Sequence, residues 1–382
     1  MRYEIDAMTL QIIEVESKSE LKQFIDLPWA IYRDDPYWVP PLKRDVRDLL
    51  SPRHPFYGHA QRQLFLALRG GTPVGRIAAI INHRHNEFHS ERSGFFGFFE
   101  CADDQEAAGA LLREAENWIE AKGMDRVLGP ANPSTNEECG LLVNNYLSPP
   151  FVMMTYNPPY YRELIEGAGY GKAKDLYAYW YHVGHELPAM LRRIVEKVQD
   201  KEKDLVVRHL DMKRFDADLE AVRTIYNEAW EKNWGFVPMT DEEITYMAKK
   251  LKPLVAPSIV NLAFVGGEPA GFAMGLPDYN QVLKILNGSI ANPVRTLKAL
   301  AAGKRIRSGR CLTLGVREKY RKRGIESLLF AMTWQGGIDM NYRYGEFSWV
   351  LEDNKPIHDA ATRIFSAEHY KTYRIFAKPL TP

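Results

Sequence analysis

The sequence has few cysteines, no long apolar run and almost no net charge. Its three cysteines, Cys101, Cys139 and Cys311, lie far apart and form no CxxC pair, which argues against a disulfide framework and a structural zinc site. No apolar run approaches the roughly 20 residues of a membrane span. Residues 1–20 are rich in acids and lack the apolar core of a signal peptide. We therefore expect a cytoplasmic protein without a membrane span.

The formal net charge of +1 hides a local concentration of basic residues. The segment from Gly303 to Arg323 contains nine lysines and arginines and a single acid, so it carries +8 and the rest of the chain −7. A confined patch suits a small polyanionic ligand better than a nucleic-acid groove, which usually has a wide basic stripe interleaved with aromatics. The alternative is a solvated helix end. We expect no nucleic-acid partner.

One pattern occurs twice along the chain. "LFLALRGGTPVGRIAAI" (residues 64–80) and "VNLAFVGGEPAGFAMGL" (residues 260–276) both predict a hairpin with Gly-Gly-X-Pro at the turn. Helices and strands follow in a similar order in both halves, and 382 residues are too many for one ordinary core. We predict two α/β domains, at residues 1–185 and 204–382, joined by a helix at residues 186–203.

The basic patch ends between a predicted strand and a predicted helix. The N-terminus of a helix offers unpaired amides and a favourable dipole to an anion. The spacing Val316-x4-Arg321-x2-Gly324 resembles the acyl-CoA-binding motif V-x(4)-[QR]-x-x-G-x-[GA] of the GNAT acyltransferase superfamily. Glu326 departs from it, because the motif has a small residue there. The following "FSWVLEDNKPIHDAATRIF" resembles the strand, asparagine and helix that complete the superfamily's CoA-binding half.

The resemblance covers residues 204–382 well and residues 15–185 more loosely. Phrases such as "FGFFEC" also resemble a bacterial family of tandem GNAT-like proteins. The resemblance implies an α/β fold of two tandem GNAT-like acyl-CoA N-acyltransferase domains, each a mixed, mostly antiparallel sheet flanked by helices.

The resemblance also implies acyl-CoA as the co-substrate, bound between two splayed parallel strands, "CLTLGV" and "FSWVL". Backbone groups of the first strand would pair with the pantetheine arm, and amides of the loop would bind the pyrophosphate. The guanidinium groups of Arg321 and Arg323 could cap phosphate oxygens. The expected cofactor-binding residues are Leu314, Gly315, Val316, Arg321, Lys322, Arg323, Gly324, Ile325, Glu326 and Ser327.

Catalytic candidates come from the last strands. Alternation in "EFSWVLE" predicts Glu346, Ser348 and Glu352 on one face, and we favour Glu352 as the base because it ends the strand. The alternative for Glu352 is an exposed strand-end carboxylate. Asn354 either orients substrate or caps the next helix. Thr362 stands where many relatives have the tyrosine that protonates the thiolate, so Tyr370 is the proposed acid, with Tyr373 and His358 as alternatives.

The first half lacks the phosphate loop. Its counterpart reads "ECADDQEAAGALL", and acids at a helix N-terminus repel pyrophosphate, so we expect no CoA binding there. The stretch from Asn132 to Gly140 either lines an acceptor pocket or is an ordinary loop. The aromatic segments at residues 28–41 and 149–161 are mainly packing residues, and would also suit a long-chain acceptor. His83, His85 and His89 fit no common zinc spacing, and we expect a loop there and no metal site.

The predicted function is the transfer of an acyl group, acetyl or longer, from acyl-CoA to a primary amine of a small molecule, lipid or peptide. Direct attack on the thioester needs a base for the amine, amides that polarise the carbonyl and an acid for the thiolate. Three alternatives stay open: a non-catalytic CoA-binding module, an aminoacyl-tRNA-dependent transferase and a long-chain-amine acyltransferase. Oligomeric state is not predicted.

Overall fold

The computed structural model describes residues 9–380, and the first eight residues of the acidic N-terminal stretch lie outside this range. The chain packs as two compact units. Unit 1 holds residues 9–175, 283–299 and 372–380, and unit 2 holds residues 176–282 and 300–371. Both units are discontinuous in sequence. The sequence-based limits of 1–185, 186–203 and 204–382 stay a prediction of where the two repeats meet.

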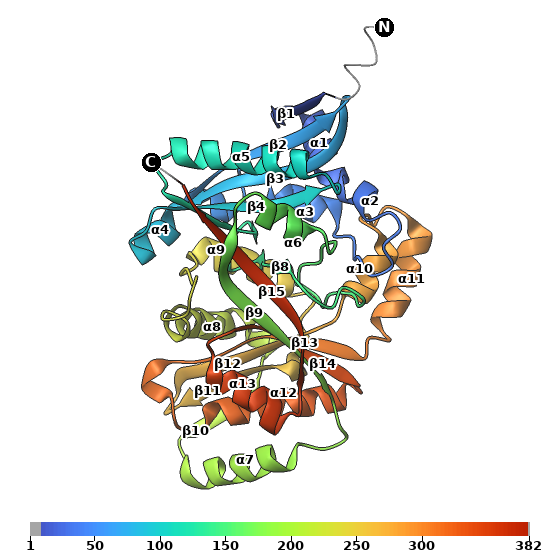
Figure 1. Cartoon of the computed structure of the whole chain (residues 1–382). Coiled ribbons are helices and arrows are strands. Elements are labelled where there is room, and N and C mark those ends of the chain that lie inside the picture. The colour runs from blue at the N-terminus through green and yellow to red at the C-terminus, as the bar shows by residue number, and fades with distance from the viewer. Residues whose placement is uncertain (1–8, 381–382) are drawn as a thin grey trace, which may run out of the picture. The chain divides into compact units, whose positions relative to one another are not determined.

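The first half of the chain alternates short helices with a hairpin and further strands (Figure 1). Its elements are β1 (Leu10–Glu14), α1 (Lys18–Asp26), α2 (Pro28–Ile31), α3 (Lys43–Leu49), β2 (Ala60–Arg69), β3 (Thr72–Asn82), α4 (His83–His89), β4 (Ser93–Cys101), α5 (Gln105–Ala121), β5 (Arg126–Gly129), β6 (Ala131–Asn132), β7 (Glu138–Cys139), β8 (Leu141–Leu142), α6 (Tyr161–Gly167) and β9 (Gly171–His182).

The second half repeats this plan with longer helical insertions. Its elements are α7 (Ala189–Lys201), β10 (Leu205–His209), α8 (Phe215–Ala229), α9 (Asp241–Leu251), β11 (Val260–Val265), β12 (Glu268–Pro277), α10 (Asn280–Leu286), α11 (Pro293–Gly303), β13 (Ser308–Val316), α12 (Ile325–Asp339), β14 (Tyr344–Leu351), α13 (Lys355–Asp359) and β15 (Glu368–Pro379).

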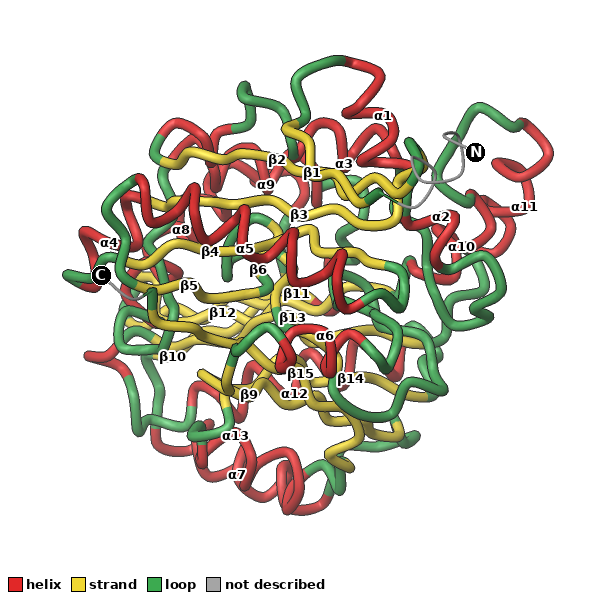
Figure 2. The backbone as a smooth tube through the Cα atoms, turned by 45° about the horizontal axis from the view of Figure 1, so that its top comes forward, coloured by secondary structure: helices red, strands yellow, loops and turns green. Residues whose placement is uncertain are grey.

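The two units build their sheets in the same order. In unit 1, β1 to β4 pair antiparallel, β4 pairs parallel with β5, and β5 pairs antiparallel with β15 (Figure 2). In unit 2, β10 to β13 pair antiparallel, β13 pairs parallel with β14, and β14 pairs antiparallel with β9. The fold is therefore the predicted one, two mixed, mostly antiparallel sheets with flanking helices. Each sheet ends in a strand that comes from the other half of the sequence.

Apolar spacing explains how helices cover these sheets. Helix α5 begins at the N-cap Asp104 and lies across β2 and β3 (Figure 1). Its buried side chains recur every three or four residues and include Leu111, Leu112 and Ile119. Burial of each such side chain contributes about 1.5–3 kcal/mol. In unit 2, α12 is apolar on two sides, because Leu329 packs towards β12 and β13 while Phe330 and Trp334 join a separate aromatic cluster.

One local expectation was wrong. The stretch with His83, His85 and His89 forms helix α4, not a loop, because the Asn82 side chain caps it by accepting a 3.1 Å hydrogen bond from the His85 amide. Between residues 9 and 380, no three or more His, Cys, Asp or Glu side chains are arranged to hold a metal ion. None of the helices in the same range is long and apolar enough to cross a bilayer.

Candidate active site

The parallel strands of unit 2 separate part-way along their length. Residues Ser308 to Cys311 of β13 pair in register with Tyr344 to Phe347 of β14, and among the described residues no pair joins the two strands beyond that point. On its other edge, β13 shifts register against β12 between Met274 and Gly275. The later residues of β13, which include Leu314, Gly315 and Val316, thus turn one backbone edge away from any strand. This is the splayed pair that the sequence predicted.

The loop after β13 leads into an uncapped helix N-terminus. Gly324 is the N-cap of α12 and has a φ of +79°, which glycine adopts without strain. No side chain caps this helix, and within the described chain the amides of Ile325 and Glu326 have no acceptor. The Ser327 amide donates to the Gly324 carbonyl at 3.1 Å. These free amides fit a diphosphate, which helix N-termini commonly bind.

The arginine side chains of the loop bind protein groups instead of pointing to an open site. Arg321 donates to the carbonyls of Val316 at 3.2 Å and Ala229 at 2.8 Å. Arg323 forms ion pairs with Glu202 and, at 2.7 Å, with Asp204. Both guanidinium groups therefore brace the loop in this structure, which differs from the expected role of capping phosphates. Lys322 is exposed and Glu326 is half-buried.

In unit 1 the equivalent positions are filled by the chain itself. The Asn132 side chain accepts a 2.6 Å hydrogen bond from the Phe98 amide of β4, and the Ala131 carbonyl lies where a Cβ at Gly97 would sit. At the N-terminus of α5, the Asp104 carboxylate accepts from the Ala107 amide at 3.1 Å. An internal carboxylate thus occupies the anion position. This supports the expectation that the first half does not bind CoA.

A buried polar cluster lies on β13 and β14 at the point where they separate. Glu346 is fully buried and is the in-register neighbour of Arg310. Ser348 and Tyr370 each donate a short hydrogen bond to the Glu346 carboxylate, one to each oxygen. Arg310 donates to the Ser348 hydroxyl at 2.7 Å and lies 3.9 Å from Glu346. With the adjacent Lys371, which is also fully buried, these residues form what we term the Glu346 cluster.

Glu352 follows the last residue of β14, so the alternation along that strand does not extend to it. The register of β14 against β9 shifts between Phe347 and Val350, and Glu352 follows the strand in a turn. The His358 ring hydrogen-bonds the Glu352 carbonyl at 3.1 Å through Nε2, so Nδ1 accepts from the Tyr179 hydroxyl at 2.8 Å. Glu352 is half-buried and lies beside His358, whereas Glu346 lies at the centre of the Glu346 cluster.

The other proposed catalytic residues lie in three places: near His358, in the Glu346 cluster and in unit 1. Asn354 is the N-cap of α13, but its side chain makes no capping hydrogen bond. Thr362 is exposed and donates to the His358 carbonyl at 2.8 Å. Tyr373 belongs to unit 1, where it pairs with Leu142 of β8. Of the three candidates for the acid, Tyr370 is the one whose hydroxyl donates to Glu346 within residues 9–380.

Sequence reasoning missed Arg310, Ser348 and Lys371 as site residues. A signal was present, because charged residues are rarely fully buried unless paired. The apolar strand sequences "GRCLTL" and "GEFSWV" each carry one charge near the start. Two such charges in adjacent parallel strands indicate a cross-strand pair, but only the register shows that they are neighbours.

The buried amine of Lys371 makes stability depend on pH. Burial lowers its pKa from 10.5 to about 8, although Glu346 and Asp278 oppose the shift. Because the pKa is lower in the folded protein, unfolding takes up a proton between about pH 8 and 10.5, and the free energy of unfolding rises with pH across that window by roughly 3 kcal/mol. Lys371→Met should remove this rise. Urea unfolding at several pH values measures it, with the exposed Lys201→Met as control, and equal slopes in wild type and Lys371→Met would contradict the assignment.

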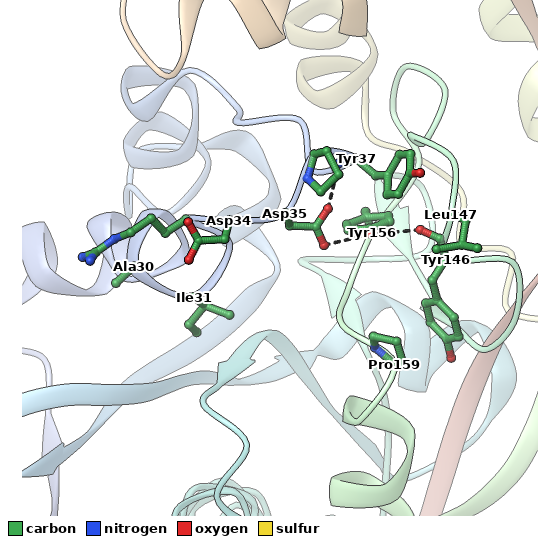
Figure 3. A pocket seen from close by; sticks show the side chains of 11 residues that line it. Ala30, Ile31, Asp34, Asp35, Tyr37, Tyr146, Leu147, Tyr156 and Pro159 are labelled. Carbon is green, nitrogen blue, oxygen red and sulfur yellow. Dashed lines mark hydrogen bonds between the residues drawn. The ribbon is translucent and has the colours of Figure 1, made fainter.

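Unit 1 contains an open cavity of about 580 Å³ (Figure 3). The two aromatic segments noted in the sequence supply most of its lining, whereas none of the residues from Asn132 to Gly140 lines it. Asp35 accepts from the Tyr156 hydroxyl at 2.9 Å and from the Tyr37 amide at 2.7 Å. The lining comprises Ala30, Ile31, Arg33, Asp34, Asp35, Pro36, Tyr37, Tyr146, Leu147, Tyr156 and Pro159. Tyrosines around the Asp35 carboxylate suit an organic cation such as an alkylammonium group, although the lining also contains the cationic Arg33.

Comparisons with known proteins agree with this architecture. No protein-family model matches the chain. The bacterial ceramide synthase of Caulobacter vibrioides is 37% identical over 379 residues, which cover 97% of this chain and 98% of that protein. Protein YghO of Escherichia coli is 33% identical over 371 residues, which cover 95% and 94%.

Solved structures share the fold at much lower identity. A tandem GNAT protein from the clavulanic acid biosynthesis pathway superposes with a TM-score of 0.58 at 13% identity, covering 98% of this chain and 99% of that chain. A probable N-acyltransferase from Enterococcus faecalis gives a TM-score of 0.52 at 11% identity, covering 98% and 73%. From its end-to-end identity with the two curated relatives, we conclude that the chain belongs to the family of the bacterial ceramide synthase and Protein YghO, and that it has the fold of the tandem GNAT acyltransferases.

Proposed function

We propose that unit 2 transfers an acyl group from acyl-CoA to the primary amine of a long-chain substrate. The observation that carries the proposal is the Glu346 cluster beside the point where β13 and β14 separate. A thioester bound along the free edge of β13 would end near this cluster, with its diphosphate at the amides of Ile325 and Glu326. The reaction would take place in the cytoplasm, as expected from the sequence.

Glu346 and Tyr370 can complete the proton balance of this reaction. The amine nitrogen attacks the thioester carbonyl carbon, so a C–N bond forms and the C–S bond breaks. The nitrogen loses its proton to the Glu346 carboxylate. Tyr370 gives its phenolic proton to the departing thiolate and takes a proton from Glu346, to which it is already hydrogen-bonded. Arg310 and Ser348 hold the carboxylate in place.

The acceptor class is supported by two independent observations. The relative from Caulobacter vibrioides is named for the synthesis of ceramide, which is the amide of a long-chain amino alcohol. The unit 1 cavity places tyrosines around the Asp35 carboxylate, a combination that suits an alkylammonium ligand. Both favour a lipid amine over a peptide or a small polar amine. The relative's name also favours a long acyl chain over acetyl.

The test is a direct assay of the purified protein. We expect palmitoyl-CoA and a long-chain amino alcohol such as sphinganine to give the amide, seen by mass spectrometry, together with one free CoA thiol per amide. Acetyl-CoA and ethanolamine serve as the short-chain comparisons. If acyl-CoA binds but no thiol appears with any amine, the protein is a non-catalytic CoA-binding module and the proposal fails.

A further inference from the structure

Helix α11 and the turn before it leave an apolar ridge exposed. Ile290 is 48% exposed, Val294 60%, Leu297 68% and Leu300 63%. These four residues, termed the α11 ridge, are four of the nine large hydrophobic side chains that are exposed in the described chain. Single exposed apolar residues are ordinary, but a cluster within eleven residues marks an interaction surface.

The ridge is one continuous face of the helix. Val294, Leu297 and Leu300 recur every three residues, so their side chains lie one above another along α11. The opposite face is the one that packs inward, where Ala299 is buried and Thr296 donates to the Ile290 carbonyl at 2.8 Å. The inward face of α11 therefore carries small side chains, and its large apolar side chains remain exposed.

The sequence around the ridge carries charge of one sign only. Residues 279–305 contain five lysines and arginines and no aspartate or glutamate. Arg295 and Lys298 each follow a ridge residue by one position and are exposed, on the side of the helix next to Val294. In the described chain, no ion pair neutralises either of them, and the same is true of Lys304 and Arg305 at the end of α11. An apolar face flanked by unpaired cations is the pattern of helices that lie in the surface of an anionic membrane.

The segment that carries the ridge is anchored to the rest of unit 1. The Trp29 indole donates to the Asn287 side chain at 2.9 Å, and the Lys43 amide donates to the Gly288 carbonyl at 3.0 Å. Gly288 has a φ of +85°, and a Cβ there would lie 2.4 Å from the Trp29 ring. The Lys284 side chain also binds the Pro36 carbonyl, at the edge of the unit 1 cavity. These contacts hold the segment in place without using the ridge.

This segment is an addition to the repeated plan. In the second half, 30 residues separate the end of β12 at Pro277 from the start of β13 at Ser308. In the first half, only 10 residues separate the corresponding β3 and β4. The longer connection contains both α10 and α11, and the sheet can be built without it.

We infer that the α11 ridge docks the protein on the surface of an anionic phospholipid membrane. The ridge side chains enter the boundary between headgroups and acyl chains, while Arg295, Lys298, Lys304 and Arg305 contact lipid phosphates. Such docking would present a long-chain amine, which partitions into the bilayer, to a peripheral enzyme. The inference does not depend on the proposed reaction, because membrane binding can be measured without substrate.

Vesicle co-sedimentation of the full chain tests the inference. We expect binding to vesicles that contain phosphatidylglycerol, weakening with salt, and much less binding to pure phosphatidylcholine. Leu297→Glu/Leu300→Glu should lower the partition coefficient at least about tenfold, because two buried apolar side chains are lost. Arg295→Glu/Lys298→Glu should lower it by a similar factor, since each cation near an anionic surface contributes about fivefold.

Met190→Glu is the matched control, because Met190 is a 51% exposed apolar residue on another helix, α7. It should bind vesicles as the wild type does. Absence of binding at every phosphatidylglycerol content, or equal loss in Met190→Glu, overturns the inference. So does a wild-type dimer that becomes monomeric in Leu297→Glu/Leu300→Glu, because the ridge would then be an interface between two copies of the chain.

Discussion

Glu346→Gln is expected to lower kcat/KM by about 10² to 10⁴, the range typical of the loss of a general base. Glutamine keeps the size of the side chain, but it cannot take the amine proton, and its single amide oxygen replaces only one of the two carboxylate oxygens that accept from Ser348 and Tyr370. Acyl-CoA affinity should change little, because the diphosphate site on α12 is not altered. Single-turnover kinetics with a saturating long-chain amine would measure the chemical step itself.

Glu352→Gln is the control for this prediction. The two glutamates are six residues apart, but Glu352 lies in the turn after β14, where the His358 ring binds its carbonyl. It should keep activity within about twofold. A large loss in Glu352→Gln with normal activity in Glu346→Gln would restore Glu352 as the base.

Folding must be separated from catalysis in this experiment. The neutral side chain leaves the buried Arg310 without its charged neighbour, which can cost several kcal/mol of stability. The melting temperature and acyl-CoA binding are therefore measured alongside activity. If Glu346→Gln fails to fold, Tyr370→Phe provides the second variant, because it removes the proposed acid and leaves both charges in place. Wild-type activity in Tyr370→Phe would remove Tyr370 from the mechanism.

Gly324→Ala is expected to raise the dissociation constant for acyl-CoA about tenfold to a hundredfold. At a φ of +79° an alanine is strained by about 1–2 kcal/mol, and its Cβ would lie 2.4 Å from a methyl group of Val198 on α7. Both effects move the loop whose amides form the anion site. Calorimetric titration with a non-hydrolysable acyl-CoA analogue measures the change, and an unchanged affinity would place the diphosphate elsewhere.

Gly267→Ala and Val198→Ala separate the causes of this effect. Gly267 has a φ of +87° in the β11–β12 turn and nothing lies within 4 Å of a Cβ there, so its substitution imposes similar backbone strain away from the site. It should reduce stability without changing acyl-CoA affinity. Adding Val198→Ala to Gly324→Ala should restore part of the affinity if the collision with α7 contributes. If Gly267→Ala weakened acyl-CoA binding equally, backbone strain would explain the loss of affinity without the collision with α7.

The parts of the site that sequence predicted are those made by neighbouring residues. The apolar run that ends at Val316, the glycine at position 324 and the apolar helix after it follow one another directly along the chain, so their spacing describes a strand, a loop and a helix N-terminus. The absence of such a loop in the first half was visible for the same reason, and Asp104 does cap α5 as an acidic helix start should.

The Glu346 cluster could not be predicted in this way. Alternation along "EFSWVLE" favoured Glu352, but a register shift ends the alternation before that residue. The parallel register of β13 and β14 places Glu346 beside Arg310, which lies 36 positions earlier in the sequence. The guanidinium groups of Arg321 and Arg323 were expected at phosphates, yet carbonyls and carboxylates from distant helices and loops hold them.

By itself, the sequence predicted a tandem repeat and placed the proposed phosphate loop in its second half, because these features arise from local spacing and local charge. The tertiary structure alone decided which strand completes each sheet. It pairs β9 with β14 and β15 with β5, so each half of the sequence finishes the other's sheet. It also decided that the Asn132 side chain accepts from the Phe98 amide of β4 in unit 1 and that Glu346 is buried beside Arg310 in unit 2. These outcomes depend on backbone pairing between residues far apart in sequence, which no local pattern specifies.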